Sequence, residues 1–200
     1  MKIQITNQPS ARLAAAAAAL FAIMLFLAGC VVTSIYPYYT GKDLVFDPAA
    51  LGDWVEAGQT NQTSEYVRIE PAGEKGYRVT FFGTDETNSS EVYLFRLKQQ
   101  LFLDTCPTNR SLDFVPVHQV SKVTQIGPVI ETANLNYDWL AKLLEKNPKA
   151  IRHMVLRDPG EQQGGRVILT ADTKELQRFI LKYVNNTNAW KGPSQLKHRN

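Results

Sequence analysis

Residues 65–83 read EYVRIEPAGEKGYRVTFFG, and this stretch decides the fold class. Its two flanks, EYVRIEP (65–71) and YRVTFFG (77–83), are rich in the β-branched and aromatic residues that favour strands. The link between them, AGEKG (72–76), has the glycines and polar residues of a tight turn. Two strands joined by so short a link pair antiparallel, so the stretch predicts a β-hairpin.

The same pattern continues on both sides of this hairpin. Further short runs of strand-forming residues, separated by Gly, Pro, Asn and Asp, lie at 51–57, 91–97, 100–106, 115–123 and 128–135. HMVLRD (153–158) and GRVILTA (165–171), joined by PGEQQGG, predict a final hairpin. The sequence therefore predicts about nine strands.

Two helices are predicted in the second half of the chain. The first follows Asn136, a plausible N-cap, and stops at Asn147-Pro148; its apolar stripe is Trp139, Leu140, Leu143 and Leu144. The second follows Asp172, which has Glu175 at capping-box spacing; its apolar stripe is Leu176, Phe179, Ile180, Tyr183 and Val184.

A long run of antiparallel strands leaves exposed edges, which closure into a barrel removes. We therefore expect a mainly β fold, an antiparallel barrel or strongly curved sheet of about 8–9 strands with two helices. Gly52-Asp53-Trp54, at the start of the first strand, resembles the G-x-W signature of lipocalin-like proteins. That resemblance implies that Trp54 plugs the closed end of the barrel and that a helix at 172–184 packs outside it. The alternative is that Trp54 is an ordinary core residue.

The N-terminal segment has the order of a secretory leader. Lys2 and Arg12 precede an apolar stretch from Leu13 to Leu27, and small residues follow. The string Leu27-Ala28-Gly29-Cys30 resembles the lipobox of bacterial lipoproteins. The alternative is a transmembrane anchor, for which 13–29 has only about the minimum length.

The lipoprotein resemblance implies a location and one modified residue. In that family the leader, here 1–29, is removed and the cysteine thiol, here on Cys30, is diacylated, which anchors the protein in a membrane. In that family an aspartate directly after the cysteine tends to retain the protein at the inner membrane, but here Val31 follows the cysteine. The resemblance therefore implies the bacterial outer membrane, facing the periplasm, rather than the inner membrane.

The expected organisation after the leader has three parts. Residues 30–50 are expected to be a lipidated N-terminus and tether, 51–185 a single β-rich domain and 186–200 a flexible tail. The tyrosines at 36, 38 and 39 fit either a strap packed on the barrel surface or an aromatic belt at lipid headgroups.

Few residues suggest chemistry. His118 and His153 lie in predicted strands without a recognisable metal spacing, and Cys106 is the one thiol besides Cys30. A nucleophilic Cys106 needs a base such as His118 nearby, whereas a buried, inert thiol needs none. No nucleophile elbow, phosphate-binding loop, dinucleotide fingerprint or H-E-x-x-H motif is present. Cys30, the lipidation site, is thus the single predicted site residue, with no catalytic, cofactor or metal residue.

Composition narrows the function classes. With 22 basic and 19 acidic residues in 200 the chain has no electrostatic footprint for nucleic acid. We expect a non-enzymatic, lipid-anchored envelope protein that binds a small apolar ligand or a partner protein. One alternative is an envelope hydrolase that uses His118, His153 or Cys106. Another is a structural component of a membrane assembly, which predicts an exposed apolar patch or an open sheet edge.

Overall fold

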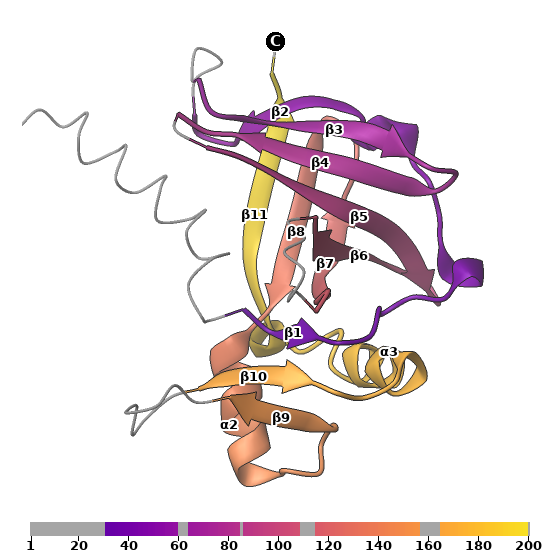
Figure 1. Cartoon of the computed structure of the whole chain (residues 1–200), viewed down its shortest axis with the longest axis vertical. Helices are drawn as coiled ribbons and strands as arrows, with labels where there is room; N and C mark the ends of the chain where they lie inside the picture. The colour runs from indigo at the N-terminus through magenta and orange to yellow at the C-terminus, as the bar shows by residue number, and fades with distance from the viewer. Residues whose placement is uncertain (1–30, 60–63, 85, 109–114, 157–164, 200) are drawn as a thin grey trace, which may run out of the picture.

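Eight antiparallel strands close into a barrel in the computed structural model, which describes residues 31–59, 64–84, 86–108, 115–156 and 165–199 (Figure 1). The strands are β2 (Gly52–Glu56), β3 (Tyr66–Ala72), β4 (Gly76–Phe82), β5 (Thr87–Leu97), β6 (Gln100–Pro107), β7 (Gln119–Gln125), β8 (Val129–Leu135) and β11 (Trp190–His198). They pair in chain order, and β11 closes the ring between β8 and β2. The predicted mainly β barrel with two helices is confirmed.

The stretch EYVRIEPAGEKGYRVTFFG forms the β3–β4 hairpin. Ala72 pairs with Gly76 across the turn, and a Cβ on Gly76 would lie 2.7 Å from the Ala72 carbonyl oxygen, so only glycine fits there. Val67 and Ile69 pair with Phe81 and Val79, and all four line the inside of the barrel. The alternation that predicted the hairpin therefore also sets its inner face.

A second, smaller sheet lies outside the barrel. Its strands are β1 (Thr33–Ser34), β10 (Arg166–Leu169) and β9 (His153–Leu156), in the order β1-β10-β9. The predicted hairpin forms as β9 and β10, but it pairs with β1 and not with a barrel strand. Helices α2 (Tyr137–Lys146) and α3 (Thr173–Lys182) lie with this sheet below the barrel (Figure 1).

Side-chain caps fix where these helices begin. The Asn136 side chain accepts hydrogen bonds from the backbone N–H groups of Asp138 and Trp139, and the Asp172 side chain accepts one from Glu175. Three short 3₁₀ helices complete the structure: η1 (Gly41–Asp43), η2 (Pro48–Ala50) and η3 (Thr187–Ala189).

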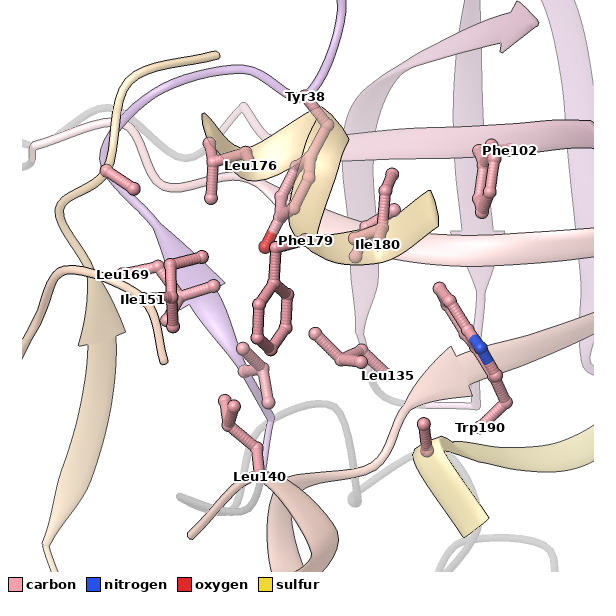
Figure 2. Close-up of a cluster of buried hydrophobic side chains, with 14 of the residues drawn as sticks. Tyr38, Phe102, Leu135, Leu140, Ile151, Leu169, Leu176, Phe179, Ile180 and Trp190 are labelled. Carbon is pink, nitrogen blue, oxygen red and sulfur yellow. The ribbon is translucent and has the colours of Figure 1, made fainter. Parts of the chain in front are cut away.

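The wall of β5 to β8 separates two apolar clusters. One lines the inside of the barrel around Trp54. The other lies outside, where Phe95, Phe102 and Leu135 of the barrel meet the two helices and the small sheet. Figure 2 shows Tyr38 and Phe179 within this outer cluster, with Phe102 and Trp190 on the barrel side. The small sheet and helices thus form one folded unit with the barrel.

The expected tether is wrong for residues 31–50, which form a strap on the barrel. Val32 and Tyr38 are fully buried in the outer cluster, and Leu44 bridges to Phe95 of β5. The Thr173 hydroxyl of α3 donates to the Pro37 carbonyl at 2.8 Å. Burial of the large apolar surfaces of Val32 and Tyr38 is favourable, so this segment packs against the barrel instead of staying solvated.

The expected flexible tail at 186–200 is wrong as well. Residues 190–198 are β11, which pairs with β8 on one side and β2 on the other. Its polar composition hides the strand, but Ser194 and Leu196 still alternate into the cavity. The folded unit therefore runs through the described residues from 31 to 199, beyond the predicted bounds of 51–185.

The leader and Cys30 lie outside the described residues. Within the described ranges, no helix has the length and hydrophobicity needed to cross a membrane.

Candidate ligand cavity

The barrel encloses a cavity of about 980 Å³. This volume lies at the upper end of the range for small-molecule pockets. One end is closed by the strap and by Trp54, while the lining at the other end includes Gln59, Glu65 and Thr108, which flank the barrel strands.

Trp54 forms the floor of the cavity. Its side chain is fully buried, and its Nε1 donates to the Ala50 carbonyl of η2 at 3.0 Å. The Tyr77 hydroxyl ties the strap to β4, accepting from the Asp47 N–H at 2.7 Å and donating to the Asp47 carbonyl at 3.1 Å. Because Tyr77 and the tryptophan are both held by the strap, this end of the barrel stays shut.

The backbone conformation and the close packing around position 52 explain the glycine of the G-x-W tripeptide. Gly52 has φ of 125°, which L side chains rarely adopt, and a Cβ there would lie 3.3 Å from the ring of His198. The His198 ring in turn stacks on Trp54 with centroids 3.8 Å apart. The first and last strands of the barrel, β2 and β11, therefore meet at Trp54.

The wall formed by β5 to β8 and β11 changes from apolar to polar along the barrel axis. Next to the floor the inward side chains are Ile69, Val92, Leu94, Leu103, Ile130 and Leu196. Towards the open end the inward positions of β5, β6, β7, β8 and β11 carry Asn88, Ser90, Thr105, Gln119, Ser121, Thr132, Asn134 and Ser194, whereas those of β3 and β4 stay apolar with Val67 and Phe81. A molecule that fills this cavity is therefore expected to have an apolar part and a polar part.

Charged side chains line the cavity towards its open end. The lining includes the carboxylates Glu56, Glu65 and Glu86 and the guanidinium of Arg166. Among the described lining residues the carboxylates outnumber the guanidinium groups, so this part of the open end favours a neutral or cationic group over an anionic one.

Thr33 of β1 adds an unused polar group at the same end. Thr33 lines the cavity and is 8% exposed. The Thr33 hydroxyl has no hydrogen-bond partner in the described part of the chain. A buried hydroxyl without a partner costs free energy, so Thr33 is a local weak point in the packing of β1.

The residues predicted for chemistry lie elsewhere. His118 Nδ1 is 2.7 Å from Asp104 Oδ1, on the outer side of the wall, and Asp104 Oδ2 accepts from the Tyr38 N–H at 2.8 Å. Asp104 is completely buried. The pKa of the Tyr38 phenol is raised, first by the burial of the phenol itself and then by the negative charge of Asp104. Asp104, held by His118, thus fixes the strap to β6, which is a structural role.

Cys106 and His118 are neighbours, but not in the cavity. Thr105 pairs with Gln119, so the next outward positions of the two strands are Cys106 and His118. Cys106 also pairs across from Glu91 of β5. His153 is separated from His118 by Ser34 and Leu169, a distance of about 14 Å at ordinary strand spacing. The structure thus brings Cys106 and His118 together outside the cavity and keeps His153 apart from them.

Comparison of the chain with protein-family models, curated proteins and solved structures gave no match in any of the three. Within the described part of the chain, no group of three or more His, Cys, Asp or Glu side chains is placed to hold a metal ion.

Sequence reasoning missed the cavity-lining residues Thr33, Glu56 and Arg166. The available signal was strand alternation, which places Glu56 on the same side of β2 as Trp54. No local pattern indicates that β1 and β10 approach the barrel opening, because their contact joins segments more than a hundred residues apart.

Proposed function

We propose that this protein binds one amphiphilic small molecule inside the barrel while attached to a membrane at its N-terminus. The observation that carries the proposal is the 980 Å³ cavity, with an apolar floor and an opening of mixed polarity whose described charged residues are mainly acidic. The ligand has an apolar chain that packs against the walls near Trp54 and a neutral or cationic head at the open end.

Three features support this function over the alternatives. A lipocalin-like barrel with a tryptophan plug, as Gly52-Asp53-Trp54 suggests, is suited to hold an apolar ligand. The Leu27-Ala28-Gly29-Cys30 string supports acylation of Cys30 and an outer-membrane location. Cys106 and His118 are neighbours, as the hydrolase alternative requires, but both lie outside the cavity lining, as does His153.

A binding experiment with matched probes tests the proposal. The full chain, purified in mild detergent, is titrated with a dansylated dodecylamine that keeps its ammonium head, and separately with a dansylated undecanoate. We expect saturable enhancement of dansyl fluorescence with the ammonium probe and weaker binding of the carboxylate probe, because the described charged residues of the opening are mainly acidic.

Two tryptophan substitutions locate the binding. Thr105→Trp places an indole inside the cavity, and Arg78→Trp places the same group on the outer face of β4. We expect Thr105→Trp to weaken binding at least tenfold and Arg78→Trp to leave it unchanged. Equal affinities for both variants would contradict binding in the barrel.

A further inference from the structure

The described chain begins at the open end of the cavity. Val31 and Thr33 both line the cavity, and β1 runs parallel to β10 with Thr33 opposite Ile168. Ile168 and Arg166 of β10 line the cavity too. The first residues after Cys30 therefore form part of the rim.

Both interpretations of the N-terminal segment place a bilayer next to this rim. If Cys30 is acylated, its lipid chains start one residue before Val31, about 3.8 Å away along the chain. If 13–29 is retained as a span, it ends two residues before Val31. In each case the membrane surface lies beside the cavity opening.

Exposed apolar side chains lie at the same end of the small sheet. We call Met154, Val155 and Leu156 of β9 the hairpin strip; they are 45%, 44% and 50% exposed. Successive strand residues point to opposite faces, so exposure of all three means that both faces of this part of the strand are uncovered in the described structure. Such a strip is costly in water unless another surface covers it.

The strand register places the hairpin strip close to the rim. Leu156 pairs with Arg166 of β10, and Met154 pairs with Ile168, which in turn pairs with Thr33. Because β1 and β10 are parallel, Val31 is level with Arg166, two residues before the Thr33–Ile168 pair. Leu156 therefore lies about two strand spacings, roughly 10 Å, from Val31. Arg166, which is exposed, sits between the two.

We propose that the rim and the hairpin strip dock on a phospholipid bilayer, so that the cavity opens to the membrane and exchanges its ligand with it. The proposal rests on the membrane attachment proposed above. Apolar side chains insert at the boundary between headgroups and acyl chains, and Arg166 meets lipid phosphates there. A membrane amphiphile then moves between bilayer and barrel without crossing water.

A bilayer fits this surface better than a second copy of the chain. Three half-exposed side chains provide far less than the roughly 800 Å² per partner of a stable protein interface. A surface beside a membrane anchor needs only a small additional contact, because the anchor already supplies the high local concentration.

A fluorescent label on the hairpin strip tests the docking. The full chain, purified from bacterial membranes and carrying Cys106→Ser, is labelled with NBD at Leu156→Cys and reconstituted in phosphatidylcholine vesicles. The matched control is Glu74→Cys, an exposed site in the β3–β4 turn at the closed end of the barrel. We expect two- to fourfold higher NBD emission at position 156, quenched by doxyl-labelled lipid, and no change at position 74.

Each other outcome counts against the proposal. Vesicle flotation of the protein with equal signals at 156 and 74 overturns the docking while the attachment stands. Enhanced emission at 156 that doxyl lipid does not quench assigns the strip to protein contact at the β9 edge and also overturns it. Failure of the protein to float removes the attachment and the docking together.

A charge substitution provides a second measurement that needs no label. Leu156→Asp should slow transfer of the dansylated dodecylamine from phosphatidylcholine vesicles to the protein at least fivefold, with unchanged affinity in detergent. Unchanged transfer overturns the docking, whereas loss of binding by the unmodified chain in detergent overturns the ligand proposal instead.

Discussion

Replacement of Asp104 by alanine should destabilise the fold more than any surface change. The Asp104 carboxylate is 0% exposed, and it accepts hydrogen bonds from the Tyr38 N–H at 2.8 Å and from His118 Nδ1 at 2.7 Å. Each buried donor that is left without an acceptor costs about 1–3 kcal/mol, so we expect Asp104→Ala to lose about 2–5 kcal/mol in total. The orphaned Tyr38 N–H alone accounts for about 1–3 kcal/mol of this loss.

An asparagine at the same position separates charge from hydrogen bonding. Asp104→Asn keeps one carbonyl oxygen as an acceptor but loses the second acceptor, so we expect an intermediate loss of about 1–3 kcal/mol. Glu70→Ala, an exposed carboxylate on β3, is the matched control and should stay within about 0.5 kcal/mol of the unmodified chain.

Equilibrium unfolding in urea, followed by far-ultraviolet circular dichroism, measures these differences. A domain of this size has a total stability of about 5–15 kcal/mol, so the Asp104→Ala loss should lower the urea midpoint visibly. A loss below about 1 kcal/mol for Asp104→Ala would show that the pair does not hold the strap, and our assignment of a structural role would be refuted.

Three further substitutions test other parts of the fold. Trp190→Ala should cost about 3–5 kcal/mol in the same urea assay, because this side chain of β11 is buried against Phe102; a flexible tail would show no loss. Tyr38→Phe should stabilise the protein by up to about 1 kcal/mol, since the Tyr38 hydroxyl is buried without a partner in the described part of the chain; a measured loss would indicate an additional hydrogen bond. Asp53→Asn should lose at most about 1 kcal/mol at pH 7, since its ion pair with Arg68 is partly exposed. The hydrogen bond from Arg68 lowers the pKa of Asp53 in the folded protein. The stability that this ion pair contributes is therefore present above the unfolded pKa of about 3.9 and is lost as the pH falls through the lower folded pKa. The stability difference between the unmodified chain and Asp53→Asn, measured by urea unfolding, should thus be present at pH 7 and disappear at pH 2.

The open edge of β9 bears on the alternative of a structural membrane component. That alternative predicts an exposed apolar patch, and the hairpin strip is one. The barrel cavity, however, gives the molecule a feature that a purely structural part does not require. The label at position 156 distinguishes lipid contact from protein contact on this strip.

Local signals in the sequence determined most of the individual elements. Strand alternation in 65–71 and 77–83, turn residues in 72–76 and the caps Asn136 and Asp172 act over a few residues, so each is readable without the fold. The barrel also followed, because consecutive antiparallel strands need closure to remove their edges.

Only the tertiary structure decided which segments complete the barrel and where the cavity opens. The polar stretch from 190 to 198 becomes a strand because β8 and β2 offer it unpaired backbone groups on both sides, and its own side chains give little sign of this. β1 and β10 reach the cavity rim through pairing between segments more than a hundred residues apart, which no local pattern encodes. The sequence by itself thus determined most of the barrel strands and both helices, and it predicts a lipidated cysteine at position 30. The packing of distant segments decided that the residues next to that cysteine line the opening of a ligand-sized cavity.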